Sequence, residues 1–139
     1  MGVFEVRNLT RQSLSGAPFA KAARAILPSW DISLVFVGTR RATHFNRALR
    51  GKKYTPNVLA YALGPHHGEV IVCPQIAKTQ ARLFGLSVPH TTLFLFIHGL
   101  LHLKGYRHGT TMEQCERKLL ARFASGLNRT YDTTNRYWH

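Results

Sequence analysis

Acidic residues are scarce in this sequence. Its 139 residues include 6 Asp+Glu against 19 Lys+Arg, and the few acids are scattered along the chain. A nuclease that holds two metal ions between carboxylates needs several clustered acids, and a two-carboxylate glycosidase needs a matched pair. The composition therefore argues against both of these enzyme classes.

Cysteine and long apolar runs are scarce as well. Cys73 and Cys115 lie far apart and neither belongs to a C-x-x-C pair, so we expect two reduced, partly buried thiols in a reducing compartment. The longest apolar run, near Leu93, is too short and too rich in histidine for a membrane span, and Met1 to Val6 shows no signal-peptide pattern. We therefore expect a cytoplasmic protein that does not enter a membrane.

Positive charge, by contrast, is abundant. The formal net charge of +13 predicts a polyanionic partner, most often nucleic acid, with a surface that merely aids solubility as the alternative. A solvated helix face usually mixes charges of both signs. Residues 40–53 instead hold six cations and no acid, which predicts a phosphate-contacting surface made of Arg40, Arg41, Arg47, Arg50, Lys52 and Lys53. Among these, Arg50 stands out because it ends a predicted helix beside Gly51.

Three histidines near residue 100 form the most informative pattern in the chain. The apolar run before them predicts a buried helix from about Pro89 to about Lys104. Four residues turn a helix by about 400°, so His98 and His102 share a face about 6 Å apart and can hold one ion. Gly105 is expected to end the helix, so that the chain folds back and brings His108 to a third corner. The pattern predicts a metal site with His98, His102 and His108 as ligands.

Gly99 stands where a zinc peptidase of the H-E-x-x-H type carries its general base. Glycine inside a helix costs about 1 kcal/mol relative to alanine. We interpret Gly99 as providing open space beside the metal, enough for a bulky anionic group. The missing glutamate argues against a peptidase, although a metal-dependent hydrolase of another bond stays an alternative.

The remaining patterns predict strands interleaved with helices. Strands are expected at 3–7, 32–37, 58–63 and 69–73, the last two joined in hairpin fashion by 64–68. Helices are expected at 13–28, at 39–49 with Thr39 as cap and Leu49 facing inward, at 74–84, at 89–104, and from a capping box at Thr110 to Gly126. The expected fold class is α+β, with a small mixed sheet of about four strands, about five helices, and the metal site at the end of a buried helix. We expect one domain over 1–126 and a C-terminal tail over 127–139.

The histidine stretch His98-Gly99-Leu100-Leu101-His102-Leu103-Lys104-Gly105-Tyr106-Arg107-His108 resembles the H-G-x-L-H-L-x-G-Y-D-H signature of the YbeY endoribonucleases, the rRNA maturation factors. Arg50-Gly51-Lys52-Lys53 and Asn57-Val58-Leu59-Ala60-Tyr61 are similar to that family's R-G-K and T-[DN]-V-L-S-F, and Gly68-Glu69-Val70 resembles its G-D-I. The resemblance runs from about residue 3 to about residue 126. The sequence departs from the signature at Arg107, where the family usually has aspartate.

The resemblance implies one zinc ion held by His98, His102 and His108, with Arg50 lining the same cleft. It also implies a metal-dependent, single-strand-specific endoribonuclease that acts in rRNA processing and ribosome quality control, near the ribosome. Zinc held by three imidazoles keeps a position open for water or a phosphoryl oxygen. Either water activated by the metal or the ribose 2′-OH is then the nucleophile, and a non-catalytic RNA-binding assembly factor with a structural zinc is the other alternative.

Overall fold

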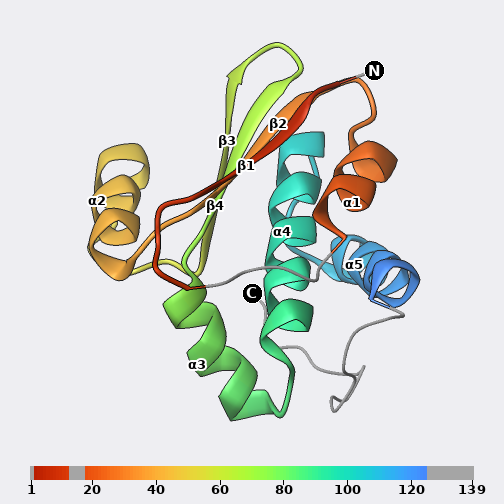
Figure 1. Ribbon diagram of the computed structural model, residues 1–139. Coiled ribbons are helices and arrows are strands. Elements are labelled where there is room, and N and C mark those ends of the chain that lie inside the picture. The colour runs from red at the N-terminus through yellow and green to blue at the C-terminus, as the bar shows by residue number, and fades with distance from the viewer. Residues whose placement is uncertain (1, 13–17, 125–139) are drawn as a thin grey trace.

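The computed structural model describes residues 2–12 and 18–124, which form one four-stranded sheet with helices on both of its faces (Figure 1). In chain order the elements are β1 Phe4–Asn8, α1 Phe19–Ile26, β2 Asp31–Phe36, α2 Thr39–Arg50, β3 Val58–Gly64, β4 His67–Val72, α3 Pro74–Phe84, α4 Val88–Lys104 and α5 Thr110–Phe123. The expected fold class, α+β with a small mixed sheet and five helices, is confirmed. The proposed tail, 127–139, lies outside the described residues.

The strand order in the sheet is β1-β2-β4-β3. β1 and β4 pair with β2 in parallel, whereas β3 pairs with β4 in antiparallel fashion and forms one edge of the sheet. The hairpin between β3 and β4 is tighter than expected, because the strands continue to Gly64 and resume at His67, which leaves a turn of Pro65 and His66. His66 has a φ of 53° in that turn.

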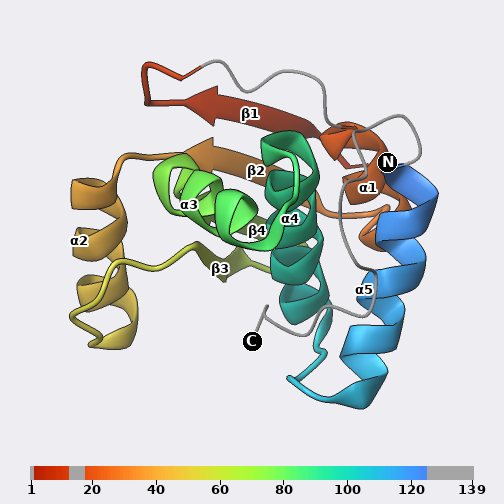
Figure 2. The same ribbon diagram turned by 90° about the horizontal axis from the view of Figure 1, so that it is seen from below.

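Alternating apolar residues cover both faces of the central strands, as their sequence predicts. One face carries Ile32, Leu34 and Phe36 into the main core with α1, α4 and α5. The other face carries Val35 and Val37 into a smaller core. Figure 2 shows the consequence, with α2 on one side of the sheet and α1, α4 and α5 on the other.

α4 is the central helix of the main core, and it contacts β3, β4, α1, α3 and α5. Every residue from 90 to 101 is buried. At its start, the Ser87 side chain accepts a hydrogen bond from the His90 backbone N–H at 3.1 Å. At its end, Gly105 adopts the left-handed conformation, with φ of 111°, as predicted for a C-terminal cap.

Several local expectations are wrong at helix ends. Gly38 and Gly109, not Thr39 and Thr110, occupy the N-cap positions of α2 and α5, and neither makes a side-chain capping bond. The first helix begins at Phe19 in the described residues, and the predicted stop at residue 126 lies outside them. Leu49 is 48% exposed.

Among the described residues, no single helix is long and apolar enough to cross a membrane. Pro74–Leu83 and Val88–Lys104 reach that length and composition only as a pair, which is bent by 116° between them.

Candidate metal centre

The three predicted ligands come together at the C-terminal end of α4. His98 is buried and His102 half-buried on one face of the helix, while His108 is exposed on the loop that Gly105 turns back. Each ring offers one nitrogen, and these nitrogens all lie within 4.8 Å of one another. The three residues could therefore hold a metal ion.

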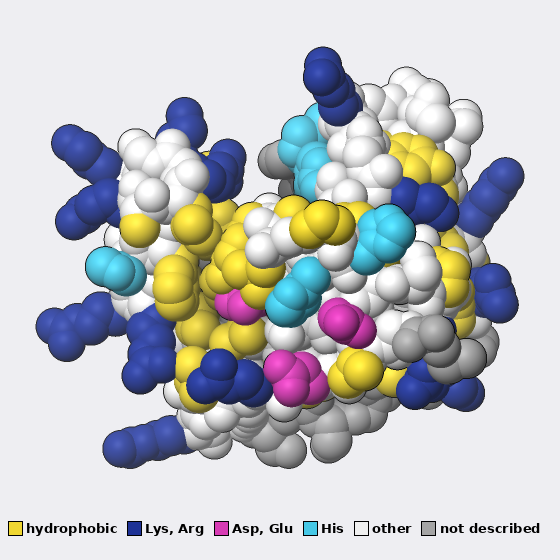
Figure 3. All heavy atoms as spheres, turned by 90° about the horizontal axis from the view of Figure 1, so that it is seen from above, with side chains coloured by type: hydrophobic (Ala, Val, Ile, Leu, Met, Phe, Trp, Pro, Cys, Tyr) yellow, Lys and Arg dark blue, Asp and Glu magenta, His cyan; other side chains and the backbone are white. Residues whose placement is uncertain are grey.

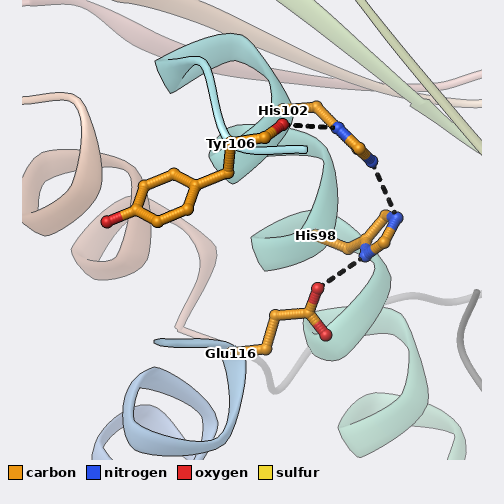
Figure 4. Close-up of polar contacts among 4 residues, drawn as sticks. All are labelled: His98, His102, Tyr106 and Glu116. Atoms are coloured by element: carbon orange, nitrogen blue, oxygen red, sulfur yellow. Dashed lines mark hydrogen bonds and ion pairs between the residues drawn. The ribbon is translucent and has the colours of Figure 1, made fainter. Parts of the chain in front are cut away.

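Hydrogen bonds to their neighbours orient two of these rings (Figure 4). His102 Nδ1 lies 3.1 Å from the backbone oxygen of Tyr106, which can only accept, so His102 Nδ1 carries the hydrogen. His98 Nδ1 lies 2.8 Å from Glu116 Oε1, and an ionised carboxylate likewise only accepts. In the neutral rings both Nε2 atoms are then left with lone pairs.

These two Nε2 atoms face each other across 3.1 Å. Two lone pairs at this distance repel unless a cation lies between them. Two ligands bound to a tetrahedral ion at about 2.0–2.1 Å would be separated by roughly 3.3 Å, close to the spacing seen here. The donor set therefore fits a metal ion held by imidazole nitrogens.

A proton is the other cation that two facing imidazoles could share. Burial lowers the pKa of His102 below its ordinary value of 6.5, and the nearby His98 and His108 lower it further. The Tyr106 carbonyl and Glu116 oppose this effect without overcoming it. The environment thus favours a neutral His102, whose Nε2 lone pair can bind an ion.

Glu116 is a residue of this site that sequence reasoning missed. It is 3% exposed, and it reaches His98 from α5. Carboxylates that accept from the second nitrogen of a ligating imidazole fix its tautomer and raise its basicity. A signal was present in the sequence, because Glu116 shares a helical face with Met112 and Leu119, and an acid is unusual on an apolar face.

Arg107, which replaces the aspartate of the signature, is exposed. The partners of His98 and His102 come instead from Glu116 and from the backbone of Tyr106. Orientation of these two imidazoles therefore does not depend on the side chain at position 107.

Gly99 lines the cavity beside the histidines, but the direction in which its side chain would point is filled rather than open. A Cβ atom at this position would lie 2.8 Å from Val70 Cγ1 and 3.5 Å from the Ala60 Cβ. Glycine is needed here because α4 packs closely on β4 and β3. The same contact leaves no room for a glutamate side chain, which counts against the peptidase alternative.

The histidines line a cavity of about 670 Å³ between α4 and the segment that joins α2 to β3. Arg50 lines the same cavity at the C-terminal end of α2, so the structure brings it to the site. Its Nη1 donates to the side-chain oxygen of Asn46 at 3.4 Å. Asn46 is fully buried, in place of the expected Leu49, and its amide nitrogen donates to the Tyr54 backbone oxygen at 2.9 Å.

The other predicted cations stay on the surface. These five described residues are exposed, and none of them lines the cavity: Arg40, Arg41, Arg47, Lys52 and Lys53. In the space-filling view of Figure 3, Lys and Arg side chains surround the lobe that α2 forms at the left. A hollow separates this lobe from a second lobe, which carries histidine side chains on the side that faces the hollow.

Comparisons with known proteins agree with the resemblance seen in the sequence. A protein from Helicobacter pylori, named Endoribonuclease YbeY, is 34% identical over 110 residues, which cover 76% of this chain and 79% of its own length. Proteins of the same name from Bdellovibrio bacteriovorus and Neisseria meningitidis are 35% and 37% identical over 83 and 89 residues. These matches cover 58% and 56% of this chain, but only about half of each relative, 55% and 52%.

The fold has a counterpart among solved structures. The solution structure of a Thermotoga maritima protein aligns with a TM-score of 0.62 over 96% of this chain and 98% of its own, at 21% identity. At that identity the likeness concerns the fold alone. The family model described as Endoribonuclease YbeY matches residues 3–124, nearly all of the described chain. The chain belongs to the YbeY family.

Proposed function

We propose that this protein is a zinc-dependent endoribonuclease that cuts single-stranded RNA in rRNA processing. The observation that carries the proposal is the convergence of three imidazoles with Arg50 on one cavity. Membership of the family supports it, since the relatives are named as endoribonucleases. A cytoplasmic location and association with the ribosome are the further parts of this proposal.

His98, His102 and His108 are the proposed ligands. When bound, zinc supplies a Lewis acid that polarises a phosphoryl oxygen and lowers the pKa of water. Glu116 accepts the Nδ1 hydrogen of His98, and the Tyr106 carbonyl accepts that of His102, so that both Nε2 lone pairs would be available to a bound ion.

Arg50 is the proposed phosphate-binding residue. Its guanidinium is always charged and can hold two phosphate oxygens at once, which stabilises charge that develops during cleavage. Asn46 holds the guanidinium through Nη1 and leaves its other donors for the phosphate. The cavity of about 670 Å³ could take a short segment of a single strand. Exposed cations on and after α2 would gather the RNA without reading its sequence.

Substitution of the site tests the proposal. His98→Ala, His102→Ala and Arg50→Glu should each abolish cleavage of an unstructured, end-labelled RNA. The two histidine variants should also lose zinc, measured by metal analysis, whereas Arg50→Glu should keep it. His67→Ala, which removes an exposed histidine of the hairpin, is the matched control and should cut normally.

Unchanged cutting by the three site variants would contradict the proposal. Tight RNA binding without cleavage by the zinc-loaded wild-type protein would instead favour the non-catalytic assembly factor.

A further inference from the structure

We propose that the α2–β3 side of the cavity is a nucleobase subsite, in which the Tyr54 ring stacks on an unpaired base of the RNA. This inference rests on the proposed function for the class of ligand. It gives Tyr54 a role in contacting a base, which is distinct from binding phosphate or metal. Tyr54 is a large side chain that is 54% exposed, and it lines the same cavity as Arg50 and the histidines.

The segment that carries Tyr54 is held in place. Its backbone oxygen accepts from the amide of Asn46, a fully buried residue, at 2.9 Å. The neighbouring Thr55 hydroxyl hydrogen-bonds with that of Thr43 on α2 at 2.6 Å. An exposed aromatic ring on a fixed backbone loses little conformational freedom when a base stacks on it, as a stacking platform requires.

Asn46 also links this platform to the phosphate-binding group. Its side-chain oxygen accepts from Arg50 Nη1, while its nitrogen donates to Tyr54. One buried amide thus contacts a guanidinium and the backbone of an aromatic residue on the same wall of the cavity. A nucleotide presents a phosphate and a planar base to these two groups, which is why we choose a nucleobase as the occupant.

Two amide side chains lie on the same cavity. Asn57 Nδ2 donates to Gln80 Oε1 at 3.3 Å, and both residues line the cavity. This hydrogen bond does not use the oxygen of Asn57 or the nitrogen of Gln80, so the pair offers an acceptor and donors in one place. Unstacked RNA bases are read by such groups along their edges.

An abasic scan of the RNA tests the subsite. Fluorescence anisotropy would measure binding of the zinc-loaded protein to a short unstructured oligoribonucleotide, chilled and checked for intactness on a gel. In one series of oligonucleotides each base is removed in turn. We expect removal of one particular base to weaken binding by roughly tenfold, the size of one stacking contact, or about 1.4 kcal/mol.

The protein variants complete a double-mutant cycle. Tyr54→Ala should bind intact RNA roughly tenfold more weakly and should no longer respond to the missing base. Tyr54→Phe, which keeps the ring, should behave like the wild type. Leu63→Ala, a comparably exposed apolar residue of β3 outside the cavity lining, is the matched control and should bind normally.

Two results would overturn the subsite. One is an RNA affinity that ignores every abasic position, and the other is an abasic effect that persists in Tyr54→Ala. Either of these binding results can be obtained with a wild-type protein that still cuts RNA. Conversely, base-dependent binding can be measured even with a protein that does not cut RNA. Failure of the subsite is thus distinguishable from failure of the proposed function.

Discussion

Glu116 and the Tyr106 carbonyl determine which nitrogen of two imidazoles carries a hydrogen. Both act through hydrogen bonds of 2.8 and 3.1 Å to Nδ1 atoms, on the far side of each ring from the proposed ion. The contact between His98 and Glu116 joins residues 18 apart in sequence, on two different helices. A substitution of Glu116 can therefore change the metal affinity while all three histidine ligands stay in place.

Replacement of Glu116 tests this contact. Glu116→Ala should lower zinc affinity roughly 10- to 100-fold, since it removes the acceptor that orients His98 and raises its basicity. Glu116→Gln keeps an acceptor but loses the charge, and should fall between this variant and the wild type. Competition with a chromophoric chelator measures the affinity.

The matched control is Gln114→Ala, which removes an exposed polar side chain from the same helix. It should bind zinc like the wild type. Equal affinities for the two alanine variants would show that Glu116 serves the fold rather than the metal.

His102 gives the metal-free protein a dependence on pH. Burial lowers its pKa below 6.5 in the folded protein, so the unfolded chain binds a proton there that the folded chain does not. The free energy of unfolding should therefore fall as the pH drops through about 6.5. Urea melts with a chelator present, between about pH 7.5 and about pH 5.5, would measure the decline. His102→Gln should show a smaller decline, and an identical one would exclude His102 as its source.

At the scale of elements, close packing places the site. α4 lies against β3 and β4 at two glycines, Gly99 and Gly68, whose added Cβ atoms would come within 2.8 Å of Val70 and 2.7 Å of Leu103. The tight approach sets the distance between the histidines and the cavity wall formed by β3. Gly99, the first glycine of the signature, is therefore needed for close packing of α4 on the sheet.

Gly99→Ala should destabilise the protein by about 1–3 kcal/mol, the usual cost of overpacking, although alanine is the better helix former. Val70→Ala in the same chain removes the clashing methyl groups. The double variant should then lose less stability than the two single losses added together. Urea melts of the four proteins measure this coupling, and a more stable Gly99→Ala protein would contradict the packing account.

Sequence patterns predict the elements of this fold better than their ends. The apolar run and Gly105 are sufficient for α4, because helix period and glycine stop are local properties. The caps expected at Thr39 and Thr110 are wrong, since glycines one position earlier take the cap instead. The pairing of β2 with β4, across an intervening helix and strand, is set by contacts distant in sequence that no local pattern encodes.

The candidate site divides in the same way. The three histidines are close in sequence, so their spacing alone is enough to predict that they come together. Asn46 and Glu116 are polar residues on apolar helix faces, and only the structure shows what they contact. Hydrophobicity alone favours Leu49 for an inward position on α2, whereas Asn46 is the residue that is buried there.

At the scale of the whole molecule, charge is distributed over several surfaces, and the proposed RNA-contacting cations lie on and just after α2, the helix that ends at Arg50 on the cavity. Three of them belong to α2, whose last residue is Arg50. The net charge of +13 would attract RNA to any part of the surface, so a general field and a specific contact surface need to be distinguished.

Two triple variants that remove the same charge make this distinction. One replaces cations of α2 with alanine: Arg40, Arg41 and Arg47. The other replaces exposed cations of α1 and α5, across the sheet from α2: Lys21, Arg117 and Lys118. The α2 variant should bind single-stranded RNA more weakly, and its plot of log affinity against log salt should be less steep by about 0.7 for each phosphate that the protein no longer neutralises.

The α1–α5 variant should keep nearly the wild-type slope, because a distant charge adds to the field but releases no counterion from a bound phosphate. Anisotropy titrations over a range of salt concentrations give both quantities. Equal decreases of affinity and slope in the two variants would mean that the field of the whole molecule, not the α2 surface, holds the RNA. Arg50 would then be left as the phosphate-binding group that the cavity itself provides.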